Sequence, residues 1–336
     1  MGLFDAWRKR AVPLDSSRVS AALVRDTCAY LLRLTNPRLA LVPHFDERLG
    51  PPVQSALGYM ARSLDRLPSL IELDPGNWAQ HPQIASFFVS GDEIVQAFSR
   101  SDPVQQHFAK NPVADTVCAV LTTRMIEREV FGVALSDGLL HSDVRQLRVS
   151  FSDPRVPIVA HSEAELRKAI GRRMFEELAM LGMEMIATRQ DEKRELGEAR
   201  SLLLARERML QQQGAGLGET PSAIREIEAK LRENARALAK LGDGADALER
   251  DLDDLCAVLA DAENRVAIEN RPLRLTSTNQ LVERNDPGEP VRSFEQSFAV
   301  VHRGEQTRER AFLMTRFPRA ALRTETLDFE AAARLL

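Results

Sequence analysis

Apolar residues recur at intervals of three and four over residues 16–114, in short segments separated by prolines. This spacing predicts short amphipathic helices, one of them over residues 52–67. Ser90 followed by Glu93 is a capping-box pattern, and Asp102 before a proline is typical of a helix start. The first part of the chain is therefore predicted to be a helical domain.

The apolar spacing then shortens towards two residues, which is typical of β-strands. Residues 129–135 and 139–151 flank Asp137-Gly138, a pair that supplies the positive φ of a tight hairpin turn. Two strands alone would be only marginally stable, so we expect them to join the later strands in one antiparallel sheet. Those later strands are predicted over 273–282, 293–302 and 308–317.

Long helical segments separate the two groups of strands. The first begins near His161, where Ser162 and Glu165 form another capping-box pattern. Its apolar face is interrupted by the polar stretch 188–195 and ends at a glycine-rich stretch, 211–221. The residues predicted to share this face are Met174, Leu178, Leu181, Met185, Ala199, Leu202 and Met209.

A second long helix has steps of three and four between its apolar positions, which is the pattern of a coiled-coil seam. One polar seam residue, Asn234, is typical because a buried amide fixes the register at a cost in stability. Gly242 and Gly244 weaken the helix and indicate a kink or a second turn. The predicted seam is Ile224, Ile227, Leu231, Asn234, Leu238, Leu241, Ala245, Leu248, Leu252, Leu255, Leu259, Ala262 and Val266.

Together these elements predict an α+β fold in which a long antiparallel coiled-coil hairpin is inserted into a small antiparallel β domain. The seam pattern leaves open whether the coil closes within one chain or between two chains. The expected parts are an N-terminal arm (1–12), a helical domain (13–128), the first part of the β domain (129–160), the coiled-coil hairpin (161–270), the second part of the β domain (271–320) and a C-terminal helix (321–336).

Composition narrows the class of protein. Of the 336 residues, 44% are hydrophobic and 28% are charged, which is enough for at least one sizeable core. The net charge of −4 disfavours a general polyanion binder but permits a local basic patch. The three cysteines lie far apart, and no apolar run approaches the roughly 18 residues of a membrane span. These features predict a soluble cytoplasmic protein.

Motifs that carry chemistry are few. Gly214, Gly216 and Gly218 resemble a phosphate-binding loop, but such a loop follows a strand, and here a helix precedes it. His141 and Asp143 would share one face of a strand and supply two metal ligands, whereas a metal site needs three or four. We therefore predict no catalytic, cofactor-binding or metal-binding residue, and leave open an active site assembled from residues distant in sequence.

Two hypotheses for the function follow. The first is a non-enzymatic structural or interaction protein, a scaffold whose coiled-coil arm binds a protein partner or a second copy of the chain as a homodimer. The alternative is a nucleic-acid-associated factor that dimerises through the coil and contacts nucleic acid with Arg308, Arg310 and Arg316, which lie among phenylalanines. Residues 2–10 combine apolar and basic side chains and would support at most weak contact with a membrane surface.

Overall fold

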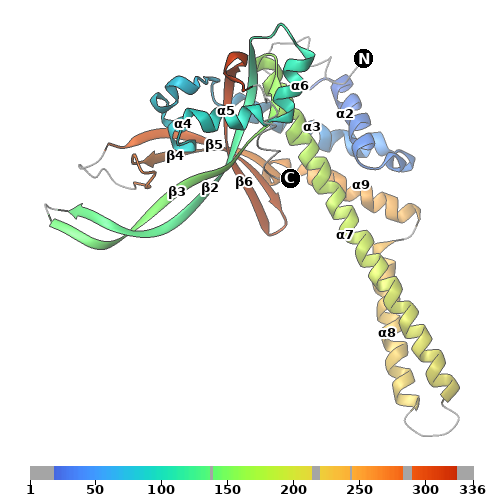
Figure 1. Ribbon diagram of the computed structural model, residues 1–336. Helices are drawn as coiled ribbons and strands as arrows, with labels where there is room; N and C mark the ends of the chain where they lie inside the picture. The colour runs from blue at the N-terminus through green and yellow to red at the C-terminus, as the bar shows by residue number, and fades with distance from the viewer. Residues whose placement is uncertain (1–18, 137–138, 214–219, 243, 283–289, 324–336) are drawn as a thin grey trace, which may run out of the picture. The chain divides into compact units, whose positions relative to one another are not determined.

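The computed structural model describes residues 19–136, 139–213, 220–242, 244–282 and 290–323 (Figure 1). These residues form two compact units, a sheet unit of residues 60–174 and 263–323 and a helical unit of residues 19–59 and 175–262. The protein has an α+β fold, and the helical residues 175–262 are inserted between strands of the sheet.

A mostly antiparallel sheet forms the centre of the sheet unit. Its described strands are β1 (Ile71–Glu72), β2 (Thr116–Ser136), β3 (Leu139–Ala160), β4 (Val266–Leu275), β5 (Arg292–Arg303) and β6 (Gln306–Pro318). They pair in the order β3-β2-β6-β5-β4, and β1 pairs with β6 in parallel. Strand β6 therefore joins the β2–β3 hairpin to the β4–β5 hairpin.

Short helices pack on one face of this sheet. They are η3 (Pro75–Gln80), α4 (Pro82–Phe87), α5 (Gly91–Ser99) and α6 (Asp102–Lys110), and η4 (Arg319–Ala321) follows the last strand. Ser90 caps α5 by accepting a hydrogen bond from the backbone N–H of Glu93, as the sequence predicted. Phe98 of α5 stacks on Phe317 of β6 with ring centroids 4.1 Å apart, and both rings are fully buried. Helices and strands thus share one apolar core.

Strands β2 and β3 extend past their neighbours as a two-stranded ribbon (Figure 1). β2 pairs with β6 only from Thr116 to Thr123, whereas its pairing with β3 continues to Ser136. On the other edge of β3, the backbone of residues 279–281 bonds to Leu147 and Val149. The name ribbon is used below for residues 124–136 and 139–152.

The helical unit contains a helical hairpin and the first helices of the chain. Its elements are α2 (Ala21–Leu34), η2 (Pro37–Leu41), most of α3 (Phe45–Asp65), most of α7 (Glu163–Gln213), α8 (Thr220–Leu241) and α9 (Ala245–Ala260). The short helix α10 (Ala262–Arg265) begins at the last residue of this unit. Tyr30 donates a hydrogen bond of 2.8 Å to Glu176, and Arg48 pairs with Asp253 at 2.5 Å. These contacts join α2 and α3 to α7 and α9.

Helix α7 runs antiparallel to α8 and α9, and these three helices are the helical hairpin. The amide Nδ2 of Asn234 donates to the backbone oxygen of Leu196 at 2.9 Å, and Nζ of Lys193 donates to that of Gly242 at 2.7 Å. Later residues of α7 therefore meet earlier residues of the returning chain. In this structure the helices pack against each other within one chain.

Two predicted boundaries between helical and β segments are wrong. The first strand of the hairpin begins at Thr116 and not at residue 129, and the helical insertion ends at Arg265 and not at residue 270. In the first case, Val117 to Leu121 are buried without alternation because both faces of β2 are covered, so the two-residue spacing is missing. In the second, Val266 pairs with Val301 of β5, a contact that the local spacing does not show.

Other predicted elements are close to those observed. Helix α7 begins after Ser162, whose hydroxyl accepts from the N–H of Glu165. Helix α3 is an exception, because it begins at Phe45, seven residues before the predicted start at residue 52, and contains two prolines. The predicted N-terminal arm, the glycines at 214, 216 and 218 and nearly all of the C-terminal helix lie outside the described residues.

Candidate functional site

The helical hairpin brings most of the predicted seam together. Ile227, Asn234, Leu252, Leu255, Leu259 and Ala262 are buried, and Ile224, Leu231, Leu238, Leu241 and Leu248 are half-buried. The side chain of Ala245 lies outside those described. Val266 is not a seam residue, because it is the first residue of β4.

A turn at Gly242 and Gly244 separates α8 from α9. Both glycines have positive φ, +75° and +56°, a region that glycine adopts without steric cost. Lys193 of α7 donates to the oxygen of Gly242, so a carbonyl at the end of α8 has a partner. Part of the polar stretch of α7 therefore contacts the end of α8 at this break.

Arg189, also in that polar stretch, points into the hairpin. Its guanidinium pairs with Asp251 and, at 2.6 Å, with Asp254. The side chain of Arg189 is 16% exposed and that of Asp251 only 7%. Burial raises the pKa of Asp254, against the lowering effect of Arg189, and the charges of Asp251 and Asp253 raise it further. The positive charge of Arg189 thus offsets the negative charges of Asp251 and Asp254, which have little contact with solvent.

Asn234 makes one polar contact in the seam and lacks another. Its Nδ2 bonds to Leu196, but its Oδ1 is buried without a hydrogen-bond partner. A buried acceptor without a partner costs about 1–3 kcal/mol. This arrangement fits a residue that fixes the register of two helices at the expense of stability.

We expect Asn234→Leu to raise the free energy of unfolding by about 1 kcal/mol, because it removes the unpaired oxygen and adds apolar contacts. The measurement is urea unfolding followed by circular dichroism at the helical signal. Leu238→Asn, which places an amide at the half-buried seam position one turn further on, should lower stability. A less stable Asn234→Leu variant would show that the amide contributes net stability.

On α7, Met174, Leu178 and Leu181 are buried as predicted, but the later part of the predicted apolar face is wrong. Leu202 and Met209 are 72% and 63% exposed, whereas Leu203 and Leu210 are half-buried. From Gly182 onward, the buried side of α7 lies one residue later than predicted. The prediction alternated steps of three and four, an average of 3.5 residues, whereas Leu178, Gly182 and Ile186 follow two steps of four, as a straight helix of 3.6 residues per turn allows. Leu202 and Met209 therefore form an exposed apolar stripe on the outer side of α7.

Two cysteines distant in sequence lie in the helical unit. Burial raises the pKa of both Cys28 and Cys256 to about 11, and each thiol is affected further by nearby charges. Cys256 lies 3.7 Å from the backbone oxygen of Arg48, which has no α-helical N–H partner because residue 52 is a proline. Thiols held in the protonated form are poor nucleophiles, so these contacts favour a packing role.

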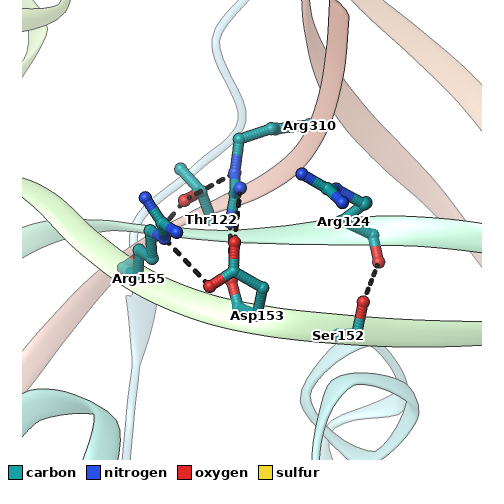
Figure 2. A network of polar contacts seen from close by, with 6 residues as sticks. All are labelled: Thr122, Arg124, Ser152, Asp153, Arg155 and Arg310. Atoms are coloured by element: carbon teal, nitrogen blue, oxygen red, sulfur yellow. Dashed lines mark hydrogen bonds and ion pairs between the residues drawn. The ribbon is translucent and has the colours of Figure 1, made fainter.

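A polar network holds the base of the ribbon (Figure 2). Asp153 has a positive φ of 54° at a register shift between β2 and β3, a conformation that aspartate tolerates better than most residues. Its carboxylate accepts from Nε of Arg155 at 2.9 Å and from Nη1 of Arg310 at 3.0 Å. Arg310 also donates to the hydroxyl of Thr122 at 3.2 Å. Hydrogen bonds from Arg155 and then Arg310 lower the pKa of Asp153.

One face of the ribbon carries arginines. Arg124 lies beside the network of Figure 2, and its backbone oxygen accepts from Ser152 on the opposite strand at 3.4 Å. Further along, Arg128 lies directly opposite Arg148. The cross-strand pairs on this side define the arginine face: Arg124 with Ser152, Ile126 with Ser150, Arg128 with Arg148, and Val130 with Gln146.

The opposite face of the ribbon has another character. Its cross-strand pairs are Met125 with Phe151, Glu127 with Val149, Glu129 with Leu147, and Phe131 with Arg145. Near the base this face joins the core, since Val149 is buried and Phe151 contacts Phe87 of α4 with centroids 4.5 Å apart. The two glutamates therefore lie on the side away from Arg124, Arg128 and Arg148.

The three arginines proposed from sequence as nucleic-acid contacts have different surroundings. Arg310 belongs to the Asp153 network, and Arg316 pairs with Glu72 of β1. Arg308 is exposed at the end of β6, and no ion pair is recorded for it within the described part of the chain. Sequence reasoning missed the ribbon arginines, for which the only signal was the alternation of Arg124, Ile126 and Arg128.

Comparisons with known proteins identify no relative. No protein-family description, curated protein or solved structure matches this chain. Within the described ranges, no three histidine, cysteine, aspartate or glutamate side chains come together as a metal site, and the side chains of His141 and Asp143 lie outside these ranges. The described helices include none long and apolar enough to cross a membrane.

Proposed function

We propose that the protein is a non-enzymatic interaction protein whose helical hairpin is a coiled-coil arm that binds another protein. The simplest partner is a second copy of the chain. The observation that carries this proposal is the exposed stripe of Leu202 and Met209 on α7. Apolar side chains one heptad apart on the outer side of an already paired helix are typical of a further helix–helix contact.

The architecture supports an arm that can bind without disturbing the rest of the helical unit. The inner side of the hairpin is held by its own contacts, the amide of Asn234, Lys193 at the glycine turn and Arg189 at Asp251. A partner on the outer side of α7 would leave these contacts unchanged. Exposed Met180 and Met183, earlier on α7, offer flexible apolar side chains that adapt to such a partner.

The test is the mass of the full-length protein in solution, measured by sedimentation equilibrium over a range of concentrations. We expect self-association that Leu202→Glu with Met209→Glu weakens at least about tenfold, because two charges would be buried in the contact. Arg208→Glu is the control, since it adds negative charge to α7 at an exposed residue outside the stripe. A monomer at all concentrations, or equal weakening by the control, would reject self-association through this stripe.

The alternative hypothesis, nucleic-acid binding through the C-terminal arginines, has weaker support. Arg310 and Arg316 are held by Asp153 and Glu72. An arginine in such an ion pair must give up its carboxylate before it can bind a phosphate, which lowers the gain from binding. Of the three, only Arg308 is exposed and has no ion pair with a described side chain.

A further inference from the structure

We propose that the arginine face of the ribbon binds the phosphate backbone of double-stranded DNA, independently of base sequence. This inference goes beyond the proposed arm and uses a different surface of the protein. It rests on the placement of Arg124 and of the neighbouring pair Arg128 and Arg148 on the same face of two paired strands. All three side chains are exposed.

The like-charged pair is the first reason. Arg128 and Arg148 occupy directly opposite positions, and like charges at such positions destabilise a sheet. None of the three face arginines has a carboxylate partner among the residues whose side chains are described. Asp153, at the base of the ribbon, is already occupied by Arg155 and Arg310. A bound polyanion would supply the missing negative charge.

The dimensions of the ribbon are the second reason. Four residues of a strand span about 13 Å, so Arg124 and the pair at Arg128 lie about as far apart as the two phosphate backbones across a major groove, roughly 12 Å. At Arg148 the ribbon also pairs with residue Gln280, so the arginine face would lie across the two phosphate backbones and not enter the groove. The major groove of an RNA duplex is narrower, so its backbones do not match this spacing.

The residues between the arginines favour a duplex over other polyanions. The arginine face carries no aromatic ring, and stacking on aromatic rings is the main source of affinity for single strands. The exposed Phe131 lies on the opposite face. Ile126 and Val130 are half-buried, so this face has little apolar surface to insert into a membrane.

The net charge of −4 does not oppose local binding. At physiological salt the Debye length is about 8 Å, so acidic residues on distant surfaces are largely screened from a phosphate at the ribbon. Glu127 and Glu129 project from the other side of the two strands. The ligand would therefore meet a local positive field.

The test is fluorescence anisotropy of a labelled DNA duplex of about 20 base pairs, titrated with the full-length protein at 50 and 200 mM salt. With about four phosphate contacts, we expect the wild-type affinity to fall about 100-fold between these salt concentrations. Arg128→Glu with Arg148→Glu should weaken binding at least about tenfold at low salt and reduce the salt slope by about 2.

Two variants serve as controls. Arg145→Glu makes the same charge change on the opposite face and should leave the affinity within about twofold. Arg148→Glu alone converts the like-charged pair into an opposite-charged one, so it should weaken binding without lowering Tm. Loss of binding in that variant could not then be ascribed to unfolding.

The proposal is overturned by any of four results. These are no binding of the duplex at 50 mM salt, equal effects of Arg145→Glu and Arg148→Glu, tighter binding of a single strand of the same length, and equal binding of phosphatidylserine vesicles. None of these results bears on self-association, because the variants for that test, at Leu202 and Met209, lie on α7 in the other unit.

Discussion

Replacing Arg189 with alanine is expected to lower the free energy of unfolding of the helical unit by about 3–5 kcal/mol. The substitution leaves the buried carboxylate of Asp251 and the partly buried carboxylate of Asp254 without their cation. Burial already raises the pKa of Asp254 in the presence of Arg189. Urea unfolding followed by the helical circular dichroism signal measures the loss.

The pH dependence of this variant identifies the cause. Without Arg189, the pKa of Asp254 in the folded protein should rise further above that of an unfolded aspartate. As the pH is lowered, Asp254 is then protonated at a higher pH in the folded state than in the unfolded state. Stability lost at pH 7 should then be partly recovered as the pH is lowered towards about 5, and lost again as the pH rises. A variant whose deficit is the same at both pH values would point to lost packing and not to uncompensated charge.

Arg194→Ala is the matched control on the same helix. Arg194 pairs with Asp191 at 2.9 Å, but both side chains are 66% exposed. Ion pairs of this kind contribute little, so the change should be within about 0.5 kcal/mol. A similar loss in both variants would contradict a special role for the buried pair.

Replacing Phe98 with alanine is expected to lower the free energy of unfolding of the sheet unit by about 3–5 kcal/mol. Phe98 is fully buried and stacks on Phe317, so its removal leaves a cavity between α5 and β6. Hydrogen exchange measured by mass spectrometry should show faster exchange in peptides from these two elements.

Val113→Ala is the control for Phe98→Ala. Val113 is also apolar but is 92% exposed, so shortening it should change stability by less than about 0.5 kcal/mol. The two large variants also test the division of the chain, because Arg189→Ala should speed exchange in the helical unit and Phe98→Ala in the sheet unit. Equal effects of either substitution on both units would mean that they unfold together.

Local signals in the sequence predicted elements well where the cause of the element is local. The caps at Ser90 and Ser162 could be predicted because each depends on one local contact, in which the serine hydroxyl accepts a hydrogen bond from the backbone N–H three residues later. The glycines at 242 and 244 likewise marked a break, since their preferred backbone conformation depends little on context. The order of strands and the ends of β2 and β4 depend on pairing with distant residues.

The arginine face shows why the candidate site was not readable from sequence. Next to the turn, Ser136 pairs with Leu139, and continuing that register would place Arg128 opposite Leu147. A register shift between Gly132 and Ala134 moves the pairing by one residue, so that Arg128 meets Arg148. A one-residue shift of this kind changes which side chains are cross-strand neighbours. The pattern of apolar and polar residues in the two strands does not predict where such a shift occurs.

The central position of β6 has a consequence for how the protein is made. β6 is the last of the described strands along the chain, yet its pairing with β2 joins Thr116 to Pro318 across the whole helical insertion. During synthesis, the β2–β3 hairpin and the helical hairpin emerge first and can form from neighbouring residues, whereas the sheet cannot close before β6 leaves the ribosome. Until then β2 presents an unpaired edge and half of an apolar core. The synthesis of β6 therefore allows the sheet to close and covers that edge.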